Sequence, residues 1–370
     1  MKIIVSGGGT GGHIYPAVTL IRTLQKKVKN AEFLYVGTKI GLEADIIPKE
    51  GIPFETVDIR GFKRQLTPVN FARAGKAMYG VVKAARIVRR FQPDVVIGTG
   101  GYVCGPILLA ASLMHVPTLI QEQNVIPGIT NKILAKFVTK IAVGAPEAAV
   151  HFPAEKVTFT GNPIRAEVLS ADRMAGYRSF GLDSAKKTVL VSGGSRGARS
   201  INRAMIEVLK NAALHPQVQF LHVTGKGEYA DVMERLSAAG VDLARCPHIQ
   251  VKPYLYNMPL AMAIADLAVF RAGATGIAEL TAKGIPAILI PYPYAAENHQ
   301  EYNARALETA GAARMILNRE LTSETLMSVL TELLSEEVKL ERMSKASRTL
   351  GRPQAADTIA DMILQIAKKS

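Results

Sequence analysis

Short apolar runs alternate with helix-length segments along the whole chain. The runs in the first half are IIVSG, FLYVG, DVVIGTG, TLIQEQN and IAVG, and those in the second half are VLVSGG, FLHVTG, LAVFRAG and AILIPYP. Strands that are apolar throughout and separated by helices are typical of parallel sheets, because both faces of such a sheet are covered. The pattern therefore predicts an α/β fold.

The start of the chain is repeated near its middle. Residues 2–11 (KIIVSGGGTG) align without gaps to residues 188–197 (TVLVSGGSRG), and a helix-like stretch follows each segment. The two copies are much too far apart for a solenoid repeat. They suit two Rossmann-like domains that each begin with a strand, a glycine loop and a helix. Chance similarity of two buried strands with glycine turns is the alternative.

Glycine and proline mark the boundaries of the predicted domains, because they break regular structure. Gly-Asn-Pro at 161–163 follows the VTFT strand, and Gly-Arg-Pro at 351–353 interrupts the C-terminal helices. We expect an N-terminal domain at 1–162, a C-terminal domain at 163–349 and a last helix at about 350–370 that packs back on the first domain. The two sheets are expected to face each other across a cleft.

Composition narrows the class of protein. The 370 residues suit two or three domains, and 48% hydrophobic with 21% charged residues favours packed cores over disorder. Cys104 and Cys246 have no partner at metal-ligand or redox-motif spacing, which fits a reducing cytosol. The apolar run at 95–114 contains four glycines and a proline. We therefore expect no transmembrane helix there, and no signal peptide at the N-terminus.

The charge of the chain is strongly basic. It has 45 Lys and Arg against 31 Asp and Glu, a formal net charge of +14 at pH 7. Such a charge favours an acidic partner: nucleotide phosphates, nucleic acid or an anionic membrane. With 6% aromatic residues, no Trp and no RNA-binding motif, the chain lacks the features of a nucleic-acid-binding protein.

Three glycine-rich loops are candidate anion sites: GGGTGGH at 7–13, GTGGY at 98–102 and GGSRGA at 193–198. Glycine lets backbone N–H groups approach a phosphate, and a following helix N-terminus adds partial positive charge. None of the loops ends in the Lys-Ser/Thr of a Walker A motif, and no acidic residue ends the second strand, which argues against ATP hydrolysis and dinucleotide binding. A tight turn explains each loop alone equally well, but three at corresponding strand ends favour phosphate binding.

Polar side chains accompany these loops. His13 is either a general base or a residue that stabilises its own loop. Glu279 either accepts hydrogen bonds from a ribose diol or interacts favourably with the dipole of its own helix. The amides and the His at 298–303 suit either a sugar or solvent. The chain has no Asp-x-Asp and no His/Cys/Asp cluster with metal spacing, so helix N-termini with Arg165 and Arg271 are the candidates to neutralise a nucleotide-sugar diphosphate.

Seven motifs in order, between residue 3 and about residue 310, together resemble the MurG family of N-acetylglucosaminyltransferases: GGGTGGHIYPA, GTGGYVCGP, EQNVIPGITNK, GNPIR, SGGSRGARSIN, FRAGATGIAEL and NHQEYNA. The resemblance implies a GT-B fold, in which two Rossmann-like parallel-sheet domains face each other across a cleft. It implies inverting, metal-independent transfer of N-acetylglucosamine from UDP-GlcNAc to the 4-hydroxyl of the N-acetylmuramyl unit of lipid I. The product would be lipid II for peptidoglycan synthesis, and no cofactor is implied.

The resemblance also implies roles for individual residues. The implied donor contacts are Thr10, Gly11, Gly12, Asn124, Arg165, Ser195, Leu255, Ala274, Thr275, Gly276, Ile277, Ala278, Glu279 and Gln300. Gly100, Gly101 and Tyr102 would line the acceptor pyrophosphate side, and His13 would be the base or would orient the acceptor. A UDP-GlcNAc 2-epimerase of the same fold and a non-enzymatic basic nucleotide-binding protein are the alternatives.

The lipid acceptor implies a peripheral enzyme at the cytoplasmic face of the bacterial membrane. Two segments combine cations with apolar residues, as an anionic leaflet would favour at about 1 kcal/mol per cation. The first is 71–91, with Arg73, Lys76, Lys83, Arg86, Arg89 and Arg90 beside Phe71, Met78, Val81, Val82, Ile87 and Phe91, and the second is 131–140, with Lys132, Lys136 and Lys140 beside Ile133, Leu134 and Phe137. The alternative is that these apolar residues bury against their own sheet.

Overall fold

The computed structural model describes the greater part of the chain. The backbone is described at residues 1–57, 68–194 and 196–368, and the side chains are described at the same residues except 68–78. Contacts divide the chain into two compact units: a first unit of Met1–Ile164 with Gln354–Ser370, and a second unit of Arg165–Pro353. The chain therefore passes from one unit to the other twice.

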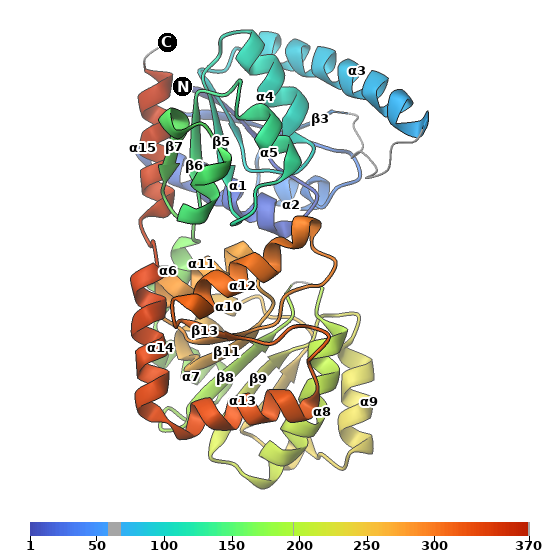
Figure 1. Ribbon diagram of the computed structural model, residues 1–370, viewed down its shortest axis with the longest axis vertical. Helices are drawn as coiled ribbons and strands as arrows, with labels where there is room; N and C mark the ends of the chain where they lie inside the picture. Colours follow the sequence, from blue (N-terminus) through green and yellow to red (C-terminus); the bar gives the residue numbers. More distant parts are fainter. Residues whose placement is uncertain (58–67, 195, 369–370) are drawn as a thin grey trace. The chain divides into compact units, whose positions relative to one another are not determined.

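A seven-stranded parallel sheet forms the centre of the first unit, in the order β3-β2-β1-β4-β5-β6-β7 (Figure 1). Its strands are β1 (Lys2–Ser6), β2 (Glu32–Gly37), β3 (Phe54–Thr56), β4 (Val95–Gly98), β5 (Thr118–Glu122), β6 (Lys140–Val143) and β7 (Val157–Phe159). Ile3, Ile4 and Val5 of β1 are fully buried although they point alternately to the two faces of the sheet. This burial explains why the strand is apolar throughout.

Helices cover both faces of this first sheet. They are α1 (Gly11–Lys27), α2 (Glu43–Lys49), α3 (Pro68–Phe91), α4 (Cys104–Leu113), α5 (Ile129–Leu134), the 3₁₀ helices η1 (Pro146–His151) and η2 (Ala154–Lys156), and α15 (Ala355–Ala367). One apolar cluster joins a face of the sheet to α3, α4 and α5, and a second cluster joins the other face to α1 and α15.

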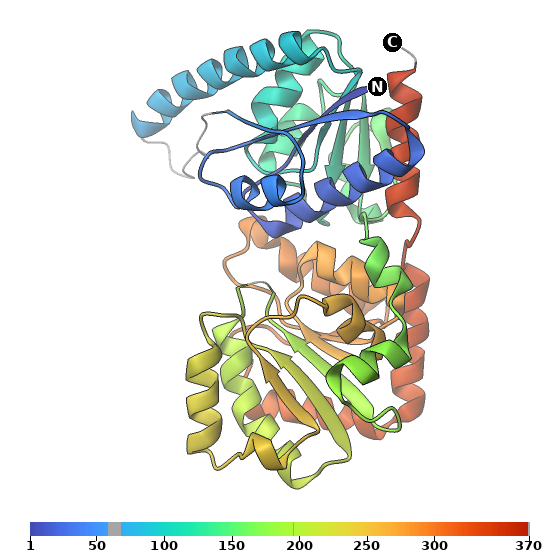
Figure 2. The ribbon, with the colours of Figure 1, turned by 180° about the vertical axis from the view of Figure 1, so that it is seen from behind.

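The C-terminal helix α15 packs beside α1 (Figure 2). Ile359 and Ile363 of α15 are fully buried in the same apolar cluster as Leu20 of α1. At the edge of this contact, Lys27 Nζ lies 2.8 Å from Asp361 Oδ1 and 3.3 Å from an Asp357 carboxylate oxygen. The last segment of the sequence therefore completes the core of the first unit.

A six-stranded parallel sheet forms the centre of the second unit, in the order β10-β9-β8-β11-β12-β13. Its strands are β8 (Lys187–Ser192), β9 (Val218–Val223), β10 (Ile249–Lys252), β11 (Leu267–Phe270), β12 (Ala287–Leu289) and β13 (Ala313–Met315). The predicted α/β class, with two Rossmann-like parallel sheets, is confirmed.

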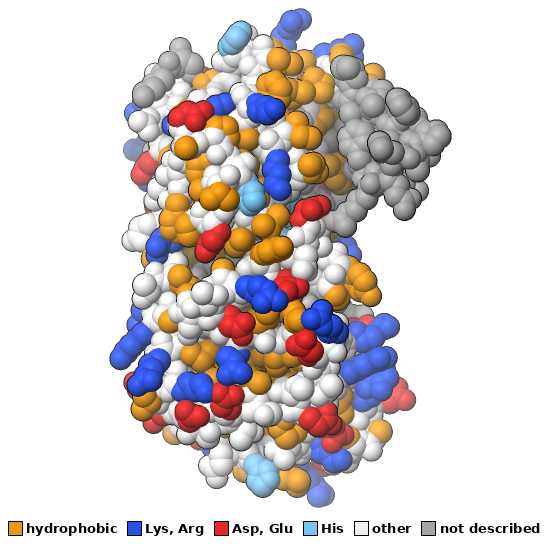
Figure 3. Space-filling view, viewed as in Figure 1, with side chains coloured by type: hydrophobic (Ala, Val, Ile, Leu, Met, Phe, Trp, Pro, Cys, Tyr) orange, Lys and Arg blue, Asp and Glu red, His pale blue; other side chains and the backbone are white. Residues whose placement is uncertain are grey.

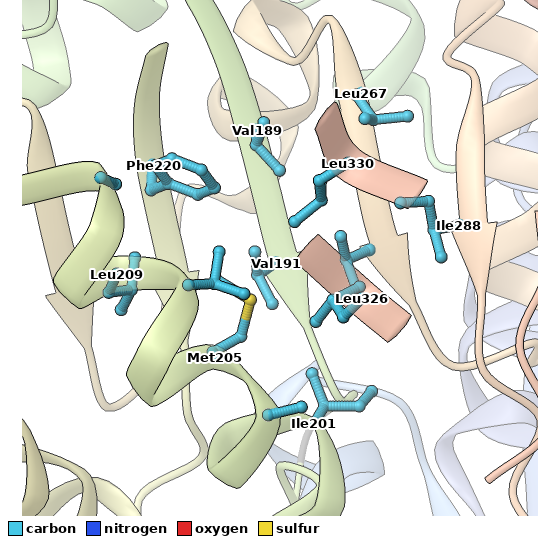
Figure 4. Close-up of a cluster of buried hydrophobic side chains, with 14 of the residues drawn as sticks. Val189, Val191, Ile201, Met205, Leu209, Phe220, Leu267, Ile288, Leu326 and Leu330 are labelled. Atoms are coloured by element: carbon cyan, nitrogen blue, oxygen red, sulfur yellow. The ribbon is translucent and has the colours of Figure 1, made fainter. Parts of the chain in front are cut away.

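The helices of the second unit again surround the sheet. They are α6 (Ala166–Ser170), α7 (Arg173–Phe180), α8 (Arg199–Leu214), α9 (Tyr229–Ala238), α10 (Met258–Ile264), α11 (Ala274–Lys283), α12 (His299–Thr309), α13 (Ser323–Ser335) and α14 (Glu337–Leu350), with the 3₁₀ helices η3 (Leu243–Arg245) and η4 (Ala296–Asn298). Figure 4 shows Met205 of α8 and Leu326 of α13 beside Val191 of β8, within one cluster of buried apolar side chains.

The two sheets have the same strand order around their first strand, and this order positions the glycine loops. In each, the first strand lies between its neighbour in sequence and a strand reached by a longer connection: β1 between β2 and β4, and β8 between β9 and β11. Ligands of such sheets bind at the carboxyl ends of the strands where the order reverses. The glycine loops after β1, β4, β8 and β11 all lie at these reversal points.

Candidate active site

The first two glycine loops lie against each other in the first unit. Gly8 N donates to Gly100 O at 3.3 Å. A Cβ on Gly7 would clash with Thr99 Oγ1, and a Cβ on Gly101, whose φ is +84°, would clash with Gly8 O. Only glycine fits this approach, which brings the predicted acceptor residues Gly100 and Gly101 beside the first loop.

The first loop ends at an uncovered helix N-terminus. Thr10 is the N-cap of α1 but makes no side-chain cap hydrogen bond, and the first turn of the helix contains no acidic residue. Thr10 and Gly12 are exposed, and Gly11 is half-buried. An N-terminus with free N–H groups and partial positive charge is suited to an anion. Tyr102, on the neighbouring loop, is 38% exposed.

His13 lies in the first turn of α1 and is held by the second loop and by Gln123, the residue after β5. Its Nδ1 is 3.1 Å from Thr99 O and 2.9 Å from Gln123 Oε1. Thr99 Oγ1 also donates to the backbone carbonyl of His13 at 2.7 Å. A Cβ on Gly100 would lie 2.6 Å from His13 Nδ1, so the ring packs directly on the backbone of the second loop.

One residue of β2 and one of α2 hydrogen-bond to the first glycine loop. Neither contact was predicted from the sequence. Tyr35 Oη donates to Gly7 O at 2.6 Å. Gly9 N donates to Glu43 Oε2 at 3.1 Å, and the Thr38 backbone N–H and hydroxyl donate to Glu43 Oε1 at 3.1 Å and 2.7 Å. Glu43 is fully buried, so it positions the loop and is not available to a ribose.

A second buried carboxylate organises the segment after β5. Glu122 accepts from Asn124 N at 3.0 Å, from Gly128 N at 3.2 Å and from Asn131 Nδ2 at 2.8 Å. Asn124 Nδ2 also donates to Glu122, at 3.2 Å. Glu122 therefore fixes the loop that carries the predicted donor residue Asn124. The polar residues Glu122-Gln123-Asn124, where an apolar strand ends, were the signal available in the sequence.

The two cysteines of the chain are Cys104 and Cys246. Both are free and buried. Cys104 Sγ donates to Gly100 O at 3.0 Å and to Ser6 O at 3.1 Å. Burial raises the pKa of Cys104 to about 12, so its thiol stays protonated and supports the second loop.

In the second unit, the loop after β8 packs against the loop after β9. A Cβ on Gly197, at φ +77°, would clash with Thr224 O, and a Cβ on Gly225, at φ +87°, would lie 2.5 Å from Arg196 O. Asn202 of α8 donates to Thr224 O at 3.0 Å and ties the two loops to the helix. Ser195, a predicted donor contact, lies outside the described residues.

The stretch 274–279 forms the start of α11. Gly273 is the N-cap and makes no side-chain cap bond, and the first turn carries no acidic residue. Thr275 Oγ1 is buried and has no hydrogen-bond partner among the described residues. A buried hydroxyl without a partner is costly unless something else satisfies it, and here it stands at an uncovered helix N-terminus. The stretch therefore offers backbone and hydroxyl groups to a ligand.

Glu279 lies beyond the first turn of α11, so the helix dipole does not explain it. Its side chain is 7% exposed, and its Oε1 accepts from Arg165 Nε at 2.8 Å. The two residues predicted as separate donor contacts are thus paired with each other. Glu279 Oε2 accepts no hydrogen bond from any described residue.

Arg271, a candidate to neutralise phosphate, is instead committed inside the second unit. Its Nη1 donates to Ile290 O at 3.1 Å, to Pro291 O at 3.0 Å and to Asn318 Oδ1 at 2.9 Å, and its Nη2 donates to Ser200 Oγ at 2.9 Å. Burial lowers the pKa of Arg271 to about 10, well above neutral pH. The interpretation of Arg271 as a phosphate ligand is wrong, because its guanidinium ties the ends of β11 and β12 together.

The amides after β12 divide into two groups. Gln300 is half-buried, and its Oε1 accepts from Tyr292 N at 2.9 Å, which leaves the amide nitrogen pointing away from this bond. Asn303 is buried, and its Nδ2 donates to Ala272 O at 3.2 Å. Asn303 therefore supports the loop before α11, and Gln300 is the better candidate for contact with a ligand.

Leu255 is buried between two tyrosines. Tyr254 and Tyr256 stack edge to face with ring centroids 4.9 Å apart, and Lys226 Nζ lies 5.4 Å and 5.9 Å from the two ring centres. Leu255 is 8% exposed whereas Tyr256 is 85% exposed. At this strand end the surface is therefore formed mainly by the aromatic neighbours of Leu255.

The predicted membrane-facing segments are partly buried. Ile87 and Leu134 belong to the apolar core of the first unit, so the prediction that they supply surface is wrong. Ile129, Ile133 and Phe137 are exposed, four residues apart along and just after α5. Figure 3 shows apolar side chains over α4 and α5 with Lys and Arg among them. Phe71, Arg73, Lys76 and Met78 have side chains outside the described residues.

The part of the chain that the structure describes contains neither a metal-binding cluster nor a membrane-spanning helix. No group of three or more His, Cys, Asp and Glu residues is placed to hold a metal ion there. No helix in the same part is long and apolar enough to cross a membrane.

Comparison with known proteins gives matches along almost the whole chain. Residues 3–143 match the glycosyltransferase family 28 N-terminal domain, and residues 188–359 match the C-terminal domain of that family. Two similar curated proteins are each named UDP-N-acetylglucosamine--N-acetylmuramyl-(pentapeptide) pyrophosphoryl-undecaprenol N-acetylglucosamine transferase. The one from Desulforamulus reducens is 47% identical over 99% of both chains, and the one from Bacillus cytotoxicus is 47% identical over 100% of both chains.

Solved structures show the same fold. MurG of Acinetobacter baumannii has a TM-score of 0.77 at 28% identity, covering 98% of this chain and 99% of that one. A UDP-GlcNAc 2-epimerase from Neisseria meningitidis has a TM-score of 0.64 at 14% identity, covering 99% of this chain and 100% of the other. The likeness to the epimerase is one of fold alone.

Proposed function

Because the chain belongs to glycosyltransferase family 28, and within it to the MurG family of N-acetylglucosaminyltransferases, we propose that it transfers N-acetylglucosamine from UDP-GlcNAc to lipid I. Lipid I is the undecaprenyl-pyrophosphoryl N-acetylmuramyl-pentapeptide, and the product is lipid II for peptidoglycan synthesis. The observation that carries this function is the 47% identity to transferases of this name over the full chain. An epimerase is much less similar, at 14% identity.

The donor is bound mainly by the second unit. The backbone N–H groups at the start of α11 and of the glycine loop after β8 receive the diphosphate, with the unpartnered Thr275 hydroxyl beside them. Glu279 receives the ribose hydroxyls on Oε2, because Oε1 is already bound to Arg165. Gln300 directs its amide nitrogen to the sugar.

Arg165 acts chiefly through Glu279. The Arg165–Glu279 ion pair fixes the carboxylate in one orientation, and the pairing offsets the cost of burying a carboxylate that is 7% exposed. Arg165 is therefore a positioning residue for ribose binding, and the diphosphate is stabilised by backbone groups.

The acceptor is bound by the first unit. The uncovered N-terminus of α1 and the backbone of Gly100 and Gly101 receive its pyrophosphate, and Tyr102 lies at the exposed edge. The 4-hydroxyl of the N-acetylmuramyl unit attacks the anomeric carbon of the donor from the face opposite UDP, so the configuration inverts. His13 takes the proton of that hydroxyl as the new bond forms. Charge that develops on the departing β-phosphate is met by oriented N–H groups without a metal ion.

The acceptor lipid brings the enzyme to a membrane surface. The transferases similar to this chain are named for an undecaprenol substrate. We propose peripheral association with the cytoplasmic face, through Ile129, Ile133 and Phe137 with the cations Lys132 and Lys136 between them. Exposed apolar residues flanked by Lys suit an anionic leaflet.

The test is incubation of the full chain with UDP-GlcNAc and lipid I, with and without EDTA. We expect UDP and a lipid-linked disaccharide to form, with most activity retained in EDTA. UDP-GlcNAc alone should stay unchanged. Appearance of UDP-ManNAc in that control would identify an epimerase, and complete loss in EDTA restored by Mg²⁺ would overturn the metal-independent mechanism.

A further inference from the structure

Three buried amide side chains form a hydrogen-bonded chain that ends at His13. Gln121 is in β5, Gln123 follows it, and Asn162 follows β7. Gln121 Nε2 donates to Asn162 Oδ1 at 2.9 Å, Gln123 Nε2 donates to Gln121 Oε1, and Gln123 Oε1 lies 2.9 Å from His13 Nδ1. All three amides are at most 7% exposed. Buried amides are costly unless every group is bonded, so such a chain is tolerated only when it is complete.

We propose that this chain of amides holds His13 in the tautomer that carries its proton on Nδ1, with Gln123 as the positioning residue. Nε2 then keeps its lone pair for the proton of the attacking hydroxyl. The catalytic consequence rests on the proposed function, whereas the tautomer itself depends only on the first unit.

Main-chain carbonyls determine which way each amide points. Gln123 Nε2 lies 2.6 Å from Thr99 O and 3.0 Å from Gln121 O. Only the NH₂ end of the amide can occupy this position, because an oxygen there would face two acceptors. Asn162 Nδ2 likewise donates to Gln123 O at 3.0 Å, which leaves Asn162 Oδ1 to accept from Gln121. The direction of every bond in the chain is thereby determined.

These bond directions determine which ring nitrogen of His13 carries the hydrogen. Gln123 must present its oxygen to His13, and the second neighbour of Nδ1 is the carbonyl oxygen of Thr99, at 3.1 Å. Two acceptors require a donor between them, so Nδ1 carries the hydrogen. The other tautomer would place the Nδ1 lone pair against both oxygens. Nε2 makes no hydrogen bond to any described residue.

A neutral amide performs here the orienting task that a carboxylate performs in a Ser-His-Asp triad. In such a triad the carboxylate holds the imidazole in the required tautomer, and the amide substitution that reverses the tautomer lowers kcat by about 10⁴-fold. In this protein the amide is already oriented as an acceptor by Thr99 O and Gln121 O, so no negative charge is placed beside His13.

The tautomer is measurable directly by nitrogen-15 NMR of the histidine rings. His13→Ala identifies the His13 signals among those of the seven histidines. We expect the neutral ring in the full chain to be protonated at Nδ1, and Gln123→Met to shift it toward the Nε2-protonated form. Gln219→Met is the matched control: Gln219 is 1% exposed in the second unit and donates to Asp183 O at 2.7 Å, so its loss should leave the His13 tautomer unchanged.

Kinetics then test whether the tautomer matters for transfer. Gln123→Met should lower kcat by about 10- to 1000-fold, which is no more than the loss of the base itself, with little change in donor KM. In a His13→Ala background the same substitution should have no further effect. Gln121→Met removes one of the oxygens that accept a hydrogen bond from Gln123 Nε2, and it should give a smaller change in the same direction. It is the variant to use if Gln123→Met does not fold.

Two outcomes would overturn the inference: a His13 ring that stays Nδ1-protonated in Gln123→Met and Gln121→Met, or a kcat loss that is equally large in the His13→Ala background. A correct tautomer in a protein that does not act on lipid I would instead overturn the proposed function and leave the control of the tautomer standing.

Discussion

Arg165 and Glu279 are 114 residues apart in the sequence, yet Arg165 Nε donates to Glu279 Oε1 at 2.8 Å. Arg165 is the first residue of the second unit, immediately after the chain leaves the first, and Glu279 is in α11. The side chain of Glu279 is 7% exposed and that of Arg165 is 34% exposed, so the carboxylate is the more costly partner to leave unpaired. The pair links the entry of the second unit to its donor-binding helix.

Replacing Glu279 by Ala should raise the KM for UDP-GlcNAc by about 10- to 100-fold, because a hydrogen bond to a charged group contributes about 1.5–3 kcal/mol. The kcat should change little, since ribose contacts are made in the ground state and the transition state alike. Steady-state kinetics at saturating lipid I measure both constants. Glu301→Ala is the matched control, since Glu301 pairs with Arg305 on the surface of α12. An unchanged KM in Glu279→Ala would refute the ribose assignment.

The Arg165→Ala variant shows whether Arg165 acts through Glu279. Alone, Arg165→Ala should raise the KM for UDP-GlcNAc. In a Glu279→Ala background it should raise this KM little further, because the partner of Arg165 is already absent. Calorimetric titration with UDP measures the affinity of each variant in the cycle. Strictly additive losses, with a fall in kcat, would place Arg165 on the diphosphate instead.

Replacing His13 by Ala should lower kcat by about 10²–10⁴-fold, the usual range for loss of a general base. The KM for UDP-GlcNAc should change little, since the donor phosphates are bound by backbone groups of the second unit. Single-turnover transfer to lipid I, with UDP affinity measured separately, distinguishes the chemical step from binding. If kcat barely falls, His13 only stabilises its loop and the base is another group.

Association with vesicles should depend on lipid charge. The full chain should sediment with anionic vesicles at low salt and less at high salt, because exposed charges are screened. Lys132→Glu with Lys136→Glu should weaken sedimentation, whereas Arg342→Glu with Lys345→Glu, on α14 of the second unit, serves as the control of equal charge change. Binding that ignores lipid charge, or that survives the first pair and also reversal of Arg86 and Arg89, would exclude these surfaces.

The stability of the second unit should fall as the pH decreases from about 6.5 to about 4. Burial lowers the pKa of His222 to about 4 from its ordinary value of 6.5, so in this window the unfolded chain binds a proton that the folded chain does not. The loss is at most about 3 kcal/mol. Urea unfolding at pH 7 and pH 4.5 should show a smaller difference for His222→Gln than for the original chain. Equal differences would show that His222 does not contribute.

Apolar runs were sufficient to predict the central strands and the edge strand β7, but not the edge strands β3 and β13. Runs such as VLVSGG correspond to β8, which is buried on both faces. The edge strands β3 (FET) and β13 (ARM) are only three residues long and each contains a charged residue, so no apolar run marks them. An edge strand is covered less completely and carries less of the sequence pattern.

The candidate site was predictable as loops but not as contacts. The partners of His13, Thr99 and Gln123, are 86 and 110 residues away, and no local pattern links them. Arg271 and Asn303 have the chemistry of ligand-binding residues, yet both are used to join strands and loops inside the unit. Sequence alone cannot distinguish a polar side chain that serves a ligand from one that satisfies a buried carbonyl.

The return of α15 to the first unit has a consequence for synthesis on the ribosome. The core that α1 and the first sheet share with Ile359, Ala360 and Ile363 lacks these residues until the final segment has been translated. A chain is synthesised from its N-terminus, so the first unit begins first. The second unit is nevertheless the first to have all its residues, because it is continuous in sequence. Until α15 has been synthesised and has packed, the apolar face of α1 that it covers lacks this partner. A stop codon at residue 354 would therefore leave the second unit whole and the first unit, which contains His13, without a complete core.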